Sequence, residues 1–181
     1  MTYFRNAAPL EWKQFLFKWT AEMRNGSACK VNPDSASIPD ILTLVQQAFA
    51  SMEARIDPPS SMHRLTVSSI RDACAAGEVW TIGDKPDACI FTKRKGDYLY
   101  IGKLSVREDM RGRGLARALV ELAETRAKMM GLSGLELETR IELTENHETF
   151  RRLGFVKSGE GAHKGFERST YIIMRKNIAA D

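Results

Sequence analysis

The sequence predicts one α/β (α+β) domain with a mixed, mostly antiparallel sheet of about seven strands flanked by helices. Three observations predict this fold class. Three β-type segments between residues 78 and 106 are joined by short links, which is typical of antiparallel hairpins. A helical segment then separates the third of these strands from a fourth, as in a parallel crossover. Finally, a chain of 181 residues can bury one full hydrophobic core but hardly two.

The N-terminal residues have the pattern of an amphipathic helix. Over residues 9–23, aromatic side chains such as Trp12 and Trp19 recur on one face. We therefore expect a helical extension, residues 1–27, before the main domain, residues 28–181. Its aromatic face would pack on the domain or across a homodimer interface. Acidic residues interrupt its polar face, which makes a membrane-surface role less favourable.

The main domain is expected to begin with a short strand and two helices. The strand covers residues 28–31. The first helix starts near Ile38, after a serine and just before a proline, as helices commonly do. The second helix covers residues 66–76 and stops at Gly77. The connection between the two helices, residues 55–64, could form one wall of a substrate site.

Three strands are expected next, over residues 78–82, 88–93 and 98–106. Their links, residues 83–87 and 94–97, are rich in Gly, Asp, Pro and Lys. Short links of this composition favour antiparallel hairpins.

The second half of the domain alternates helices with strands. Leucines at spacings of three and four predict a central helix over residues 117–131, which a glycine ends. A strictly alternating strand, residues 135–139, follows. A short helix, residues 145–153, and two closing strands, residues 155–159 and 170–175, complete the order.

An Arg- and Gly-rich turn joins the third hairpin strand to the central helix. The first N–H groups of a helix lack partners inside the helix and carry partial positive charge, so a phosphate binds well there. Gly112 and Gly114 allow positive φ and close approach of a ligand. Arg111 and Arg113 can add charge-assisted contacts. The turn is neither a P-loop nor a dinucleotide fingerprint, because neither glycine pattern is present.

Two motifs in this order resemble those of the GNAT superfamily of N-acetyltransferases. The first is Arg-x-x-Gly-x-Ala at residues 111–116, preceded by a strand that ends Leu-Ser-Val. The second is Glu138-Thr139-Arg140, followed by Asn146 and by Phe-x-x-Leu-Gly-Phe at residues 150–155. The expected order of elements from residue 28 to residue 178 is also similar to the GNAT fold.

The resemblance implies acetyl-coenzyme A (acetyl-CoA) as cofactor and direct acetyl transfer to a primary amine, on a small molecule or on a protein or peptide. In the family, the strands before and after the central helix splay apart and the pantetheine arm enters between them. A backbone N–H at Val106 is the implied oxyanion donor. The implied cofactor-binding residues are Leu104, Ser105 and Val106 beside pantetheine, Arg111, Gly112, Arg113, Gly114, Leu115 and Ala116 around the pyrophosphate, and Asn146, Phe150 and Arg151 on the late helix.

The general acid departs from the family pattern. Many relatives have a tyrosine where this chain has Phe150, and phenylalanine cannot donate a proton. We therefore name Asn146, His147 and Glu138 as catalytic candidates, each weighed against a capping, packing or solvent-exposed role. Other candidates for the acid, and for shaping the pocket, are Tyr98, Tyr100, Glu142, His163 and Tyr171. The alternative function is a non-catalytic acyl-CoA-binding or regulatory module that lost the acid.

Composition argues against several other classes of protein. The net charge is +4, but Lys and Arg are interleaved with Glu and Asp, so we expect no nucleic-acid partner. No apolar run is long enough to cross a bilayer, so we expect no membrane partner. Cys29, Cys74 and Cys89 are odd in number and widely spaced, which argues against a disulfide scaffold or a metal site. A reducing cytoplasm is the expected location.

Overall fold

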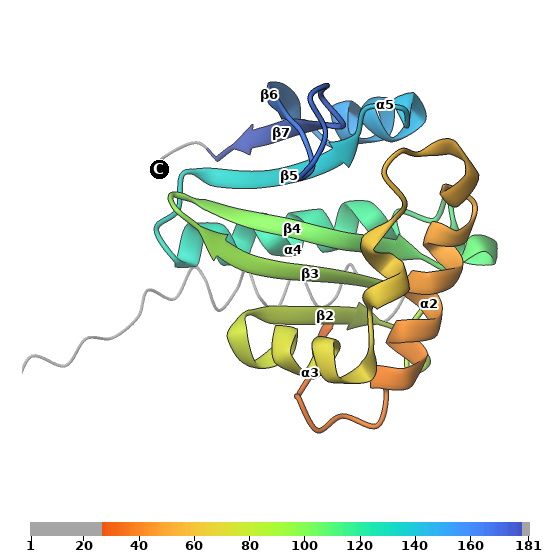
Figure 1. The fold of residues 1–181 in the computed structure, drawn as a ribbon. Helices are drawn as coiled ribbons and strands as arrows, with labels where there is room; N and C mark the ends of the chain where they lie inside the picture. The colour runs from red at the N-terminus through yellow and green to blue at the C-terminus, as the bar shows by residue number, and fades with distance from the viewer. Residues whose placement is uncertain (1–26, 179–181) are drawn as a thin grey trace, which may run out of the picture.

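The computed structural model describes residues 27–178, which form a seven-stranded sheet with helices on both faces (Figure 1). The strand order is β1-β2-β3-β4-β5-β7-β6, and only β4 and β5 are parallel neighbours. This confirms the predicted mixed, mostly antiparallel sheet. The predicted helix within residues 9–23 lies outside the described residues. The strands are β1 Cys29–Lys30, β2 Glu78–Ile82, β3 Ala88–Lys95, β4 Tyr98–Val106, β5 Gly134–Arg140, β6 Val156–Gly161 and β7 Tyr171–Asn177.

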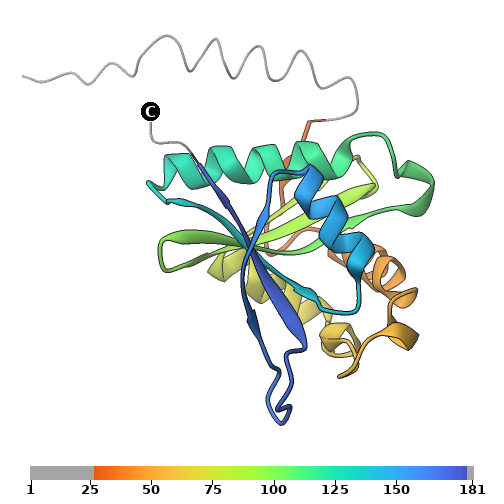
Figure 2. The ribbon, with the colours of Figure 1, turned by 90° about the horizontal axis from the view of Figure 1, so that it is seen from above.

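Helices cover the two faces of the sheet in different places. α2 and α3 lie on one side and α4 on the other, as the view from above shows (Figure 2). The side of α2 and α3 has its own core around Ile38, Ile41 and Ile70, whereas the core under α4 includes Leu119 and Phe155. The helices are α2 Ile38–Ala50, α3 Val67–Ala76, α4 Leu115–Met129 and α5 Thr144–Arg152, with short 3₁₀ turns η1 Glu53–Arg55, η2 Ser61–Arg64 and η3 Glu108–Met110.

The central helix begins and ends two residues earlier than predicted. α4 covers Leu115–Met129 instead of residues 117–131. Its predicted apolar face is buried at Leu119, but Met130 follows the helix and is 37% exposed. Gly131 has a φ of 65° and turns the chain away from the helix there.

The sheet splits along its centre. β4 pairs with β5 only at the start of each strand, the last pair being Tyr100 with Glu136. Beyond this point β4 stays with β3, and β5 stays with β7 as far as Arg140. The two strands diverge toward the end where α2 and α5 lie (Figure 1). Between the pairs Cys89–Ser105 and Phe91–Gly102, β4 has one residue more than β3. Lys103, whose φ is 49°, lies in this β-bulge, and such a bulge bends the strand that contains it.

Candidate functional site

The turn before α4 presents free backbone donors. Gly114 is the N-cap residue, has a left-handed φ of 82°, and no side chain caps the helix. The N–H of Ala118 makes the first helical bond, to the carbonyl of Gly114 at 3.0 Å, so earlier N–H groups lack helical partners. Gly112 also has a positive φ, 76°. A Cβ at either glycine would meet no atom within 4 Å, so an anion can approach the backbone.

Exposed arginines surround this turn. Arg111, Arg113 and Arg117 have no ion pair with any residue between 27 and 178. Arg107, in contrast, is held by Asp109, with 2.6 Å between Nε and Oδ1. The turn therefore offers guanidinium groups that are not held in an ion pair, which suits a pyrophosphate group.

The gap between β4 and β5 leads to the same turn. Leu104, Ser105 and Val106 are the last residues of β4, beyond its pairing with β5. Unpaired strand edges can bind an extended ligand through main-chain hydrogen bonds. A cleft of about 610 Å³ adjoins the turn and is lined by Leu44, Gln47, Ala48, Val106, Arg107, Glu108, Asp109 and Arg111.

The first two predicted residues of α5 make structural contacts. Asn146 reaches across to the connection after α2, where its Nδ2 lies 3.7 Å from the sulfur of Met52. His147 is buried, and its Nε2 lies 2.8 Å from the carbonyl oxygen of Arg140 at the end of β5. This bond ties α5 to β5 and favours a positioning role for His147, whose catalytic role stays a prediction.

The other two predicted residues of α5 differ in burial. Phe150 is partly buried against the core under α4 and packs edge-to-face on Phe155, with 5.9 Å between ring centroids. Arg151 is exposed, and its Nη1 lies 3.2 Å from a carboxylate oxygen of Glu148. Phe150 thus contributes packing, whereas Arg151 remains accessible to a ligand.

Charged and aromatic side chains gather on the sheet on the side of α2 and α3. The strand register puts Lys95, Tyr100, Glu136 and Glu138 on this side, which we call the polar face. Glu136 is buried and is held by Lys95 at 2.8 Å and by Arg175 at 2.7 Å. Lys95 also bonds to Glu138 at 2.9 Å. Burial, and then the charge of Glu138, raise the pKa of Tyr100 to about 12, so this phenol keeps its proton.

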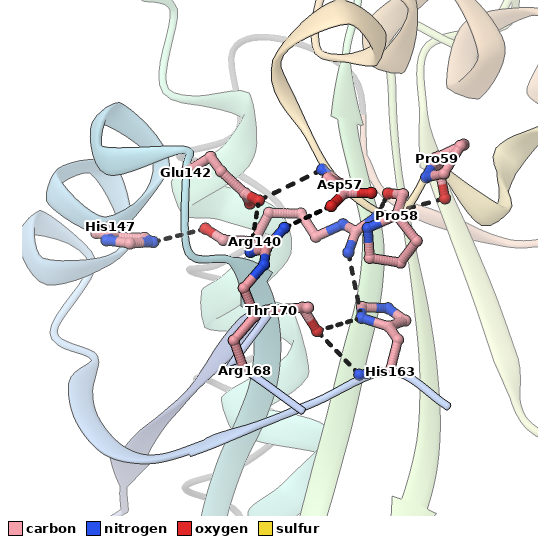
Figure 3. Close-up of polar contacts among 9 residues, drawn as sticks. All are labelled: Asp57, Pro58, Pro59, Arg140, Glu142, His147, His163, Arg168 and Thr170. Carbon is pink, nitrogen blue, oxygen red and sulfur yellow. Dashed lines mark hydrogen bonds and ion pairs between the residues drawn. The ribbon is translucent and has the colours of Figure 1, made fainter. Parts of the chain in front are cut away.

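Arg140 joins three segments at the end of β5 (Figure 3). Its Nη2 donates to the carbonyl oxygens of Pro58 and Pro59, the latter at 3.3 Å. Its Nη1 lies 3.1 Å from Nδ1 of His163, which lies 2.6 Å from the hydroxyl oxygen of Thr170. The connection after α2, β5 and the β6–β7 connection therefore meet around one guanidinium group.

A second set of hydrogen bonds and ion pairs joins the two sides of the molecule at the end where β4 and β5 diverge. Asp57 is held by Arg168 at 2.5 Å, and its backbone N–H donates to Glu142 at 3.3 Å (Figure 3). Nearby, Arg55 makes two bonds to Glu145, at 2.6 and 2.9 Å. The connection after α2 is therefore attached to the half of the molecule on the far side of the gap.

The proton position on His163 follows from its partners. Nη1 of Arg140 can only donate, so Nδ1 of His163 accepts. The backbone N–H of His163 donates to the hydroxyl oxygen of Thr170 at 2.9 Å, and this oxygen also lies 2.6 Å from Nδ1. Partial burial, and then the charge of Arg140, lower the pKa of His163. The ring is thus neutral, with its proton on Nε2.

A comparison with models of protein families shows to which family this chain belongs. The model described as "Acetyltransferase (GNAT) family" matches residues 47–155, more than half of the chain. This chain belongs to the GNAT family. The matched part runs from the C-terminal half of α2 to Phe155 and includes both motifs on which the resemblance was based. No significant relative is found among curated proteins.

Solved structures share this GNAT fold at low sequence identity. A GNAT acetyltransferase from Staphylococcus aureus Mu50 has a TM-score of 0.65 and 12% identity, and covers 83% of this chain and 99% of its own. A streptothricin acetyltransferase assigned in Bacillus anthracis str. Ames, in complex with acetyl coenzyme A, has a TM-score of 0.54 and 20% identity. The match covers 57% of this chain and 64% of that protein. Nourseothricin acetyltransferase has a TM-score of 0.51 and 22% identity over 56% of this chain. This chain spans about 65% of that protein's length.

Residues 27–178 contain neither a membrane-spanning helix nor a metal-binding cluster of side chains. No helix in this range is long and apolar enough to cross a membrane. No group of three or more His, Cys, Asp or Glu side chains in the range is arranged to hold a metal ion.

The structure brings together the predicted turn and the predicted strand edge, but sequence reasoning missed the contacts of Arg140. Arg140 is part of the second motif and His163 is expected near the pocket, but no local signal predicts that Arg140 contacts both His163 and Pro58. The positive φ of Lys103 had none either, because propensity disfavours that conformation in a non-glycine residue.

Proposed function

We propose that this chain is an N-acetyltransferase that transfers the acetyl group of acetyl-CoA to a primary amine on a small molecule or on a peptide or protein. One observation carries the proposal: an uncapped, arginine-lined helix N-terminus lies at the end of an unpaired strand edge. This pairing suits a ligand with a pyrophosphate at one end and an amide-bearing arm at the other. Family membership supports the same reading.

The residues of this site fit the cofactor. The N–H groups at Leu115 and Ala116, with the guanidinium groups of Arg111 and Arg113, would hold the pyrophosphate in the space beside Gly112 and Gly114. The backbone of Leu104, Ser105 and Val106 would pair with the pantetheine amides along the free edge of β4. Asn146, Phe150 and Arg151 would border the cofactor from α5. Acetyl-CoA supplies an activated thioester.

The chain must also move two protons. An alkyl ammonium has a pKa of about 10.4 and must lose a proton before its nitrogen can attack. We propose Glu138, on the polar face beside the gap, as the group that receives it, with Lys95 at 2.9 Å keeping the carboxylate in place. The departing thiolate needs an acid, which Phe150 cannot be. Tyr100 is the polar-face phenol that keeps its proton, so we propose it as the donor. The second proton lost by the attacking nitrogen, after attack, then returns to the Tyr100 phenolate, so that the products are the amide and the free thiol, with one proton on Glu138.

A non-catalytic acyl-CoA-binding module is the second candidate, and the observation that favours it is Phe150 at the usual tyrosine position. We propose the cytoplasm as location for either function, because Cys29, Cys74 and Cys89 are free thiols.

Two measurements separate these candidates. Calorimetric titration with acetyl-CoA tests the cofactor site, with adenosine diphosphate as a control that lacks the pantetheine arm. Thiol release over a broad panel of amines then tests catalysis. Binding with turnover supports the enzyme, binding without turnover on any amine supports the module, and no binding of acetyl-CoA contradicts both.

A further inference from the structure

Two lysines lie on the polar face, Lys93 on β3 and Lys103 on β4, which borders the gap. Lys103 occupies the bulge in β4 with a φ of 49°, and its half-buried side chain puts Nζ 5.3 Å from the ring centroid of Phe91. Lys93 lies two residues beyond Phe91 on β3, with Nζ 5.6 Å from the ring centroid of Tyr100. Residues two apart on a strand share a face, so both ammonium groups lie on the side of α2 and α3.

These two ammonium groups have no acidic partner between residues 27 and 178. The next lysine along β3 differs: Lys95 bonds to both Glu136 and Glu138. The acids of the polar face are thus already compensated, and the positive charge of Lys93 and Lys103 is not. Burial, and then the charge of Lys93, lower the pKa of Lys103, which indicates that the two cations lie close enough to repel each other.

Binding of an anion to the two lysines would be energetically favourable. A partly buried charge without a partner is costly, and an anionic ligand removes both the desolvation penalty and the mutual repulsion of the two lysines. The two aromatic rings leave the ammonium N–H groups free to donate, because cation–π contacts use the charge without an acceptor atom. Lys103 also directly precedes Leu104, where the proposed pantetheine edge begins.

We propose that Lys103 and Lys93 bind an anionic group, a carboxylate or a phosphate, of the acceptor, so that this chain acetylates amines that carry an acid group close to the amine. The inference rests on the proposed function, because it names the substrate class of the same site. It predicts amino acids, acidic peptide ends or amino-alkyl phosphates as acceptors, in preference to polyamines.

The test uses pairs of acceptors that differ only in the acid group. β-Alanine is compared with β-alaninamide, and phosphoethanolamine with ethanolamine, so that the two pairs distinguish a carboxylate from a phosphate source. We expect wild-type kcat/KM to favour the acidic member of at least one pair by tenfold or more. In Lys103→Met and Lys93→Met, KM for that acceptor should rise about tenfold to a hundredfold, as expected for a lost charge-assisted hydrogen bond. Arg71→Met, which removes one exposed charge from α3, should leave it unchanged.

A binding measurement keeps this inference separate from the proposed function. N-acetyl-β-alanine and its amide are titrated by NMR into wild-type protein and Lys103→Met with CoA present, which requires no turnover. Absence of turnover on every amine would contradict the enzyme, whereas tighter binding of the acid than the amide, lost in Lys103→Met, would still support the anion site. Equal binding of both, equal kcat/KM for both members of each pair, or acetylation of Lys103 itself by peptide mass spectrometry would overturn it.

Discussion

Replacing Gly114 by glutamate should abolish binding of acetyl-CoA while leaving the domain folded. Charge-assisted hydrogen bonds contribute about 1.5–3 kcal/mol each, and two of them lost at the helix N-terminus cost about 3–6 kcal/mol. A carboxylate about 4 Å from the pyrophosphate adds repulsion of about 4 kcal/mol at an effective dielectric constant of about 20. The lower total for the two lost hydrogen bonds, about 3 kcal/mol, already raises the dissociation constant more than a hundredfold. Calorimetric titration of acetyl-CoA measures this loss.

Gly131→Glu is the matched control at the other end of α4. Both glycines have a left-handed φ, 82° and 65°, and a Cβ at either position would meet nothing within 4 Å. Each substitution therefore costs about 1–2 kcal/mol of backbone strain. For a chain of this size that lowers the melting temperature by roughly 2–8 °C. Only Gly114→Glu should also lose affinity for acetyl-CoA. Unchanged affinity in a folded Gly114→Glu protein would refute the position of the pyrophosphate.

Three further predictions concern the polar face and the Arg140 contacts. Tyr100→Phe should lower kcat by at least about a hundredfold with little change in acetyl-CoA affinity, if the phenol donates the proton; an unchanged kcat in steady-state assays would exclude it. Arg140→Met leaves the carbonyls of Pro58 and Pro59 without their donor, so the free energy of unfolding in urea should fall by about 1–3 kcal/mol or more. The pKa of His163 is lower in the folded state than its ordinary 6.5, so stability should fall as pH drops below about 6.5. The free energy of unfolding in urea, measured at pH 7.5 and at pH 5.5, gives the size of this loss. His163→Gln should remove the contribution of His163 to it.

The sequence predicts the sheet well because its signals are local. The expected strands 78–82 and 98–106 agree with β2 and β4 at both ends, since short glycine- and aspartate-containing links fix where hairpin strands stop. The start of α4 is less well predicted. Its N-cap residue is Gly114, which has no side chain to cap the helix, so the usual Ser, Thr or Asp signal is missing.

The candidate site, too, could be predicted only where its features depend on residues that are close in the sequence. The anion-binding turn depends on neighbouring residues and could be predicted, and Gly112 and Gly114 have the positive φ that it requires. The contacts of Arg140 could not, because Pro58 is 82 residues away and His163 is 23 away. Lys103 is harder still, since nothing in its neighbours indicates a left-handed residue inside a strand. Only the extra residue of β4 at this point of its pairing with β3 explains that conformation.

His147 illustrates why a position in a motif does not determine a role. It was a candidate because it lies next to Asn146 and one turn before Phe150. Consecutive helix residues point about 100° apart, however, so His147 faces the buried side of α5 while Asn146 faces Met52. Its Nε2 forms a hydrogen bond with the carbonyl oxygen of Arg140 at 2.8 Å. A proton donor for this reaction is therefore better sought across the gap, on the polar face of β4, than on α5.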